Sequence, residues 1–150
     1  MKRATSEQKR SAVSVRKTSF DWLSFTVPTK EASPFKSLSR MASTFPLFSD
    51  VLFVGEPEEK GIFFYTWRCP VIAKDTGEQV GFVAAGGPNQ SVLVSITGSG
   101  CGFVNLSAVY DLIERTNGNL TRVDICYDDY QGVRTPHDVR AAYRRGEFIK

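Results

Sequence analysis

Hydrophobic and polar positions alternate in short runs over much of the chain, and turn-forming residues separate these runs. Runs rich in β-branched and aromatic residues predict strands at 19–28, 61–72, 79–84, 91–97 and 120–130. The turn signals "KDTGE" and "GGPNQ" separate the three middle strands, which is typical of an antiparallel meander. Within 61–69, "KGIFFYTWR" places aromatic residues on alternate faces, and we expect one of those faces to pack in the core; stacking of bases is the alternative.

Apolar residues at helical spacing predict three helices between and after these strands. The first begins at Pro34, and the last begins at Thr135 with Pro136 in the first helical position. The middle helix lies in "NLSAVYDLIERTNGN", with Asn105 as the N-cap and Gly118 as the C-terminal stop. The order β-α-β-β-β-α-β-α predicts an α+β fold, in which helices pack on one face of a mainly antiparallel sheet.

Composition favours one hydrophobic core and a reducing compartment. A chain of 150 residues with 41% hydrophobic content can bury such a core. The three cysteines are widely spaced and form no CxxC pair, which argues against a disulfide framework and a structural zinc site. No apolar run approaches the roughly 18 residues needed to span a bilayer. The sequence therefore predicts a cytoplasmic protein that does not act at a membrane.

Positive charge gathers at the two ends of the chain. Residues 1–17 hold six Lys/Arg against one Glu, a net of +5, in a chain whose overall net charge is +3. We predict that residues 1–17 form a disordered basic tail and that residues 18–150 fold. A polyanionic partner such as DNA would suit these ends, although a solubilising tail is an equal alternative. The candidate DNA-binding residues are Lys9, Arg10, Arg16, Lys17, Arg122, Arg140, Arg144 and Arg145.

The strand "LTRVDICYDDY" carries charged residues that a buried strand rarely contains. Alternation places Arg122, Asp124, Cys126 and Asp128 on one face. Carboxylates favour Mg²⁺ or Mn²⁺, so Asp124 and Asp128 are candidate ligands, with Asp21 on the first strand as a third. Asp124 and Asp128 would be about 13 Å apart on a straight strand, too far to share an ion without a bulge or a strand end. Structural pairing of the aspartates with Arg122 is an equal alternative.

Four stretches together resemble the replication initiation factors, the trans-acting rolling-circle initiators of plasmids, filamentous phages and conjugative elements. They are "DWLSFTVP", "LVSITGSGC", "LTRVDICYDDYQG" and "VRAAYRRGEF", and the acidic strand is the most specific of them. The resemblance implies an endonuclease that binds a replication origin, single-stranded or cruciform, and nicks it with a tyrosine nucleophile and a divalent metal. The resemblance also implies a bacterial host cell, and it suggests two further partners, a second copy of the chain and a host replication helicase.

The nucleophile is the point at which the chain departs from this family. Its tyrosine lies well after the acidic strand in such proteins, in a segment with no counterpart here, so we expect residues 18–150 to be the N-terminal part of an initiator domain that is incomplete at its C-terminus. Tyr130 and Tyr143 are the available substitutes. The alternative function is a DNA-binding module without catalytic activity.

Overall fold

The computed structural model describes residues 17–128 and 135–147, and the side chains of residues 19–126 and 135–147. The chain divides into two compact units, of which the larger is Ser19–Cys126. The other comprises Met1–Thr18 and Tyr127–Lys150. The larger unit contains nearly all of the sheet and the first two helices, and the third helix belongs to the other unit.

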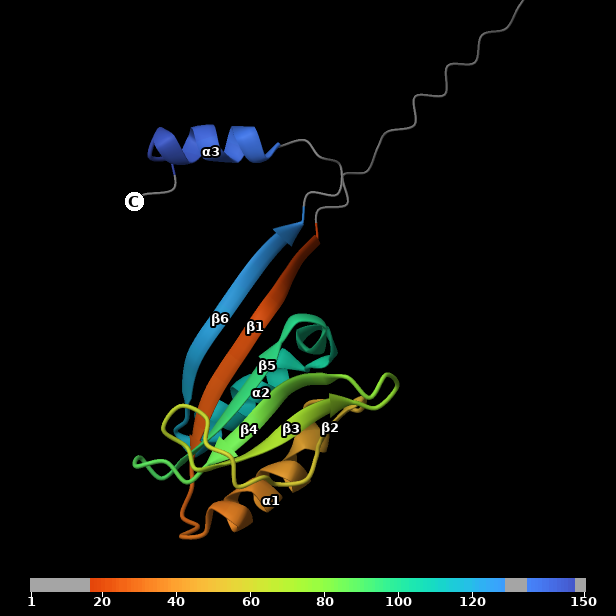
Figure 1. The fold of residues 1–150 in the computed structure, drawn as a ribbon, viewed down its shortest axis with the longest axis vertical. Coiled ribbons are helices and arrows are strands. Elements are labelled where there is room, and N and C mark those ends of the chain that lie inside the picture. The colour runs from red at the N-terminus through yellow and green to blue at the C-terminus, as the bar shows by residue number, and fades with distance from the viewer. Residues whose placement is uncertain (1–16, 129–134, 148–150) are drawn as a thin grey trace, which may run out of the picture. The chain divides into compact units, whose positions relative to one another are not determined.

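The larger unit is built on an antiparallel sheet, as the sequence predicts (Figure 1). The strand order is β2-β3-β4-β5-β1-β6, and the four described pairings from β2 to β1 are all antiparallel. None of the helices in the described part of the chain combines the length and hydropathy of a membrane span. The elements in order are β1 (Lys17–Pro28), α1 (Pro34–Thr44), the 3-10 helix η1 (Phe45–Leu47), β2 (Leu52–Val54), β3 (Trp67–Ala73), β4 (Gln79–Ala85), β5 (Ser91–Thr97), the 3-10 helix η2 (Gly98–Phe103), α2 (Leu106–Thr116), β6 (Asn119–Asp128) and α3 (Pro136–Arg144).

Two details of the predicted strands are wrong. The short strand β2 was not expected, and β3 begins at Trp67 although the pattern of aromatic residues predicts a strand from Gly61. A tight turn interrupts that pattern, because Ile62 and Tyr65 pair with each other and Phe63 has a φ of +53°. Phe63 and Phe64 at this turn are 76% and 82% exposed, so the expected packing of an aromatic face does not extend to Phe63.

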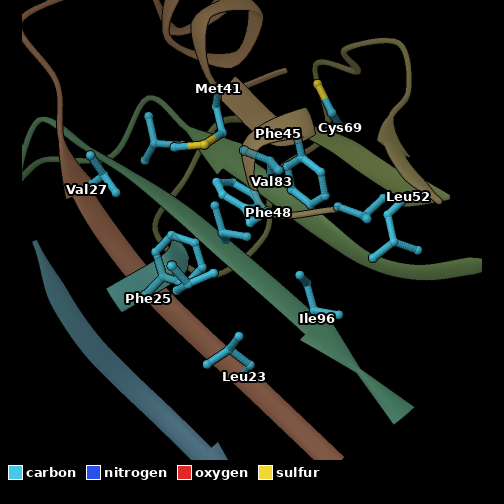
Figure 2. Packing of buried hydrophobic residues seen from close by; sticks show 14 of the residues in the cluster. Leu23, Phe25, Val27, Met41, Phe45, Phe48, Leu52, Cys69, Val83 and Ile96 are labelled. Atoms are coloured by element: carbon cyan, nitrogen blue, oxygen red, sulfur yellow. The ribbon is translucent and has the colours of Figure 1, made fainter. Parts of the chain in front are cut away.

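The hydrophobic core lies between one face of the sheet and the helices α1 and α2. Leu23, Phe25 and Val27 alternate along β1 and all point into this core (Figure 2). Phe48, which follows η1, makes edge-to-face contacts with Phe25 and Phe45, at centroid distances of 6.3 Å and 4.7 Å. Because α1 and α2 both contribute to this cluster, they cover the same face of the sheet, as predicted.

The ends of α2 and α3 follow local capping rules. The Asn105 side chain accepts a hydrogen bond from the Ala108 amide and caps α2, as predicted. At the other end Asn117, and not Gly118, adopts the left-handed conformation, with a φ of +53°. Gly118 serves a different purpose, since a Cβ there would lie 2.5 Å from the Thr26 carbonyl oxygen. Thr135 caps α3 in a reciprocal capping box with Asp138.

Candidate functional site

The sheet face opposite α1 and α2 carries a group of polar and aromatic side chains on β5, β1 and β6. Since Leu23 and Phe25 point into the core, Trp22 and Ser24 point to this other face. Ser95 lies opposite Ser24 in the pairing of β1 with β5. Val123 on β6 packs against the core, so its two neighbours, Arg122 and Asp124, point away from the core. We call Trp22, Ser24, Ser95, Arg122 and Asp124 the open-face cluster.

Two buried serines hold the indole of Trp22 in place. Its Nε1 donates hydrogen bonds to Ser24 Oγ at 2.8 Å and to Ser95 Oγ at 3.1 Å. The two hydroxyls are 2.8 Å apart and hydrogen-bond to each other. Only 6% of Ser24 and 2% of Ser95 is exposed, so both are satisfied within the protein. The indole is therefore preorganised on the sheet.

Arg122 from the neighbouring strand β6 stacks on that indole. The guanidinium carbon lies 3.7 Å from the centroid of the Trp22 ring, which is the geometry of a cation–π contact. The same guanidinium donates from Nε and Nη2 to the two carboxylate oxygens of Asp124, at 3.0 Å and 2.6 Å. This hydrogen-bonded pairing lowers the pKa of Asp124 and raises that of Arg122. Half of the Arg122 side chain remains exposed.

Of the three predicted metal ligands, the structure describes the side chains of Asp21 and Asp124. Asp124 offers both of its oxygens to Arg122. The charge of Asp21 helps to raise the pKa of the Cys101 thiol, after the larger effect of burial. Asp128 ends β6, and its side chain lies outside the described residues. Among described side chains, no group of three His, Cys, Asp or Glu could hold a metal ion. A Mg²⁺ or Mn²⁺ site on Asp21, Asp124 and Asp128 therefore stays a prediction.

The other predicted site residues fall into two groups. Tyr130 lies outside the described residues, as do Lys9, Arg10 and Arg16, and of Lys17 only the backbone in β1 is described. Tyr143 is on α3 and is 65% exposed. The basic residues predicted there, Arg140, Arg144 and Arg145, are exposed, and Arg145 Nε donates to Glu147 Oε1 at 2.6 Å.

Three members of the open-face cluster were missed by sequence reasoning, namely Trp22, Ser24 and Ser95. The available signal was the alternation of β1, which places a tryptophan and a serine on the face opposite a continuous apolar stripe. The contribution of Ser95 depends on strand pairing, because 71 residues separate it from Ser24.

Comparison with solved structures finds a similar fold in a rolling circle replication initiator protein from Geobacillus stearothermophilus. The TM-score is 0.60 at 22% sequence identity, and the match covers 88% of this chain and 51% of that protein. The chain thus spans about half the length of its structural neighbour. No protein-family model matches the sequence, and no curated protein matches it either. The likeness establishes a shared fold, in a protein of the class that the sequence motifs resemble.

Proposed function

We propose that this chain binds origin DNA in the initiation of rolling-circle replication. The observation that carries the proposal is the fold, which agrees with that of a rolling circle replication initiator protein over 88% of the chain. The sequence motifs support it independently, because they led to the same class of protein from residues alone. The function of the chain is inferred from the agreement of the fold with the sequence motifs.

Surface chemistry is consistent with DNA as the partner. The open-face cluster combines an aromatic ring with a half-exposed guanidinium, and bases stack on both kinds of group in complexes with single strands. The exposed arginines of α3 add positive charge that suits phosphate contacts. A second copy of the chain and a host helicase stay candidate partners within this proposal.

Strand nicking is the further step that the resemblance implies, and we propose that it uses a Mg²⁺ or Mn²⁺ ion and a tyrosine. Binding without nicking is the second candidate function. The pairing of Asp124 with Arg122 favours this second candidate, since a carboxylate that neutralises an arginine is a poorer ligand for a cation. The side chains of Asp128 and Tyr130, which the nicking mechanism could also use, lie outside the described residues.

One experiment in two stages tests these candidates. Binding is measured first, by the anisotropy of labelled single strands and duplexes from the DNA flanking the gene, over a series of salt concentrations. We expect an affinity that falls with salt, with a slope that changes by about 0.7 to 0.9 for each phosphate contact. An absence of salt-dependent binding to any of these DNAs would contradict the proposed function.

The second stage incubates the chain with supercoiled plasmid carrying the same DNA, with Mg²⁺ or Mn²⁺ and with chelator. Nicked circles with protein attached at a 5′ end would establish the nicking function. Binding without nicked circles under any metal condition would establish the second candidate. The Asp124→Asn variant tests the carboxylate: loss of nicking at a protein concentration that saturates the DNA is expected if Asp124 takes part in cleavage.

A further inference from the structure

The contacts within the open-face cluster leave part of the Arg122 guanidinium without a partner among the described side chains. The inner surface of the Arg122 guanidinium lies on Trp22, and one edge pairs with Asp124. Its Nη1 has no hydrogen-bond partner among the side chains that the structure describes. Half of the Arg122 side chain is exposed.

Three contacts hold this plane in a fixed orientation. The serine pair positions the indole, the indole positions the guanidinium by stacking, and Asp124 prevents rotation within the plane by binding two of its nitrogens. A planar cation that is already ordered loses little conformational entropy when a flat ligand stacks on it. A surface arginine without such support would have to be ordered by the ligand.

We propose that the Trp22–Arg122 stack is a binding platform for one base of single-stranded DNA. The base lies on the outer surface of the guanidinium, and Nη1 donates to an adjacent phosphate oxygen. Single-stranded DNA is the favoured ligand because a base within a duplex has its faces covered by its neighbours. Asp124 acts here as a positioning residue that keeps the guanidinium parallel to the indole. This inference rests on the proposed function, since it assigns a residue-level contact to DNA binding.

Substitution of Arg122 by lysine separates stacking from charge. The Arg122→Lys variant keeps the positive charge but loses the planar group. We expect its affinity for an oligo(dT) of about 12 nucleotides to fall roughly tenfold, which corresponds to one stacked base. The salt slope of binding should stay unchanged, because the number of cations is the same. Arg40→Lys is the matched control, since Arg40 is exposed on α1, which covers the other face of the sheet.

A second measurement places the base without perturbing Arg122. The chain has two tryptophans, so the Trp67→Phe variant leaves Trp22 as the source of a single indole N–H resonance in ¹⁵N NMR spectra. A base stacked over the guanidinium should shift this resonance through its ring current when oligo(dT) is added. Circular dichroism of each variant confirms that it is folded.

The outcomes distinguish this inference from the proposed function. Weakened binding by Arg122→Lys, with an unchanged Arg40→Lys control and a shifted Trp22 resonance, supports the platform. Equal binding by Arg122→Lys and the parent chain, or an unshifted Trp22 resonance at saturating oligo(dT), overturns the platform and leaves the proposed function standing. If the parent chain binds no DNA at all, the proposed function fails and the platform fails with it.

Discussion

Replacement of Ser95 by alanine should destabilise the protein through the network that anchors Trp22. The Ser95 hydroxyl accepts from Trp22 Nε1 at 3.1 Å and shares a 2.8 Å hydrogen bond with Ser24. The site is 2% exposed, so water cannot readily replace these contacts. The indole keeps its other acceptor, Ser24 Oγ, at 2.8 Å. Ser95→Ala therefore removes two hydrogen bonds, but Trp22 Nε1, the donor of one of them, keeps its bond to Ser24.

The expected magnitude follows from the net value of buried hydrogen bonds. Each neutral bond contributes about 0.5 to 1.5 kcal/mol, so Ser95→Ala should lower the free energy of unfolding by about 1 to 2 kcal/mol. Ser24→Ala should have a similar effect, because that hydroxyl also makes two of these contacts. The loss in the double variant should differ from the sum of the single losses, since the Ser24–Ser95 bond is counted in both and Trp22 Nε1 loses its last acceptor only in the double variant.

Urea unfolding followed by circular dichroism measures these free energies. Ser43→Ala is the control, because Ser43 is exposed on α1 and makes only a local bond to the Ser39 carbonyl. We expect this control to stay within about 0.5 kcal/mol of the parent chain. Single losses that add without any coupling in the double variant would refute the network, as would a Ser95→Ala protein as stable as the parent.

Three further predictions concern the core, the ion pair and a cysteine. Phe45→Ala should lower the free energy of unfolding by about 3 to 5 kcal/mol, because Phe45 is 1% exposed and packs on Phe48; urea denaturation checks this, and a loss below 1 kcal/mol would contradict the core packing. The Asp124 carboxyl should titrate below its ordinary pKa of 3.8, because the hydrogen bond from Arg122 favours its charged form. The pair is therefore fully present above pH 3.8 and is lost as the pH falls through the lowered pKa of the folded state. Carboxyl ¹³C shifts measure this titration, and a midpoint at or above 3.8 would argue against the pair. Burial, and then the charges of Glu56 and Glu58, raise the pKa of Cys69 to about 11, so alkylation of Cys69 at pH 8 should be slow in the native protein and fast in urea; rapid native labelling, detected by mass spectrometry, would show that the site is open.

Most of the secondary structure could be predicted from the sequence because its signals are local. Pro34 and Pro136 in the first turn, the Asn105 cap and the apolar stripe of α2 act within a few residues of each other, and the structure confirms all three helices. The α+β class followed from the order of these elements. The tight turn at Phe63 escaped prediction because its sequence has strong strand propensity, and the aromatic residue occupies a conformation that usually favours glycine.

Only the tertiary structure decided which side chains surround the charged strand. Sequence alternation placed Arg122 and Asp124 on one face. It did not choose between an ion pair of these residues and metal binding by the aspartate, since both need the same residues in the same register. The pairing of strands added the decisive neighbours: β1 brings Trp22 beneath Arg122, and β5 brings Ser95 to Trp22. Asp21 was predicted as a ligand on the condition that its strand lies next to that of Asp124, and the strand order places β1 beside β6. These contacts join residues far apart in the chain, so no local pattern carries them, and the side-chain geometry follows from the fold.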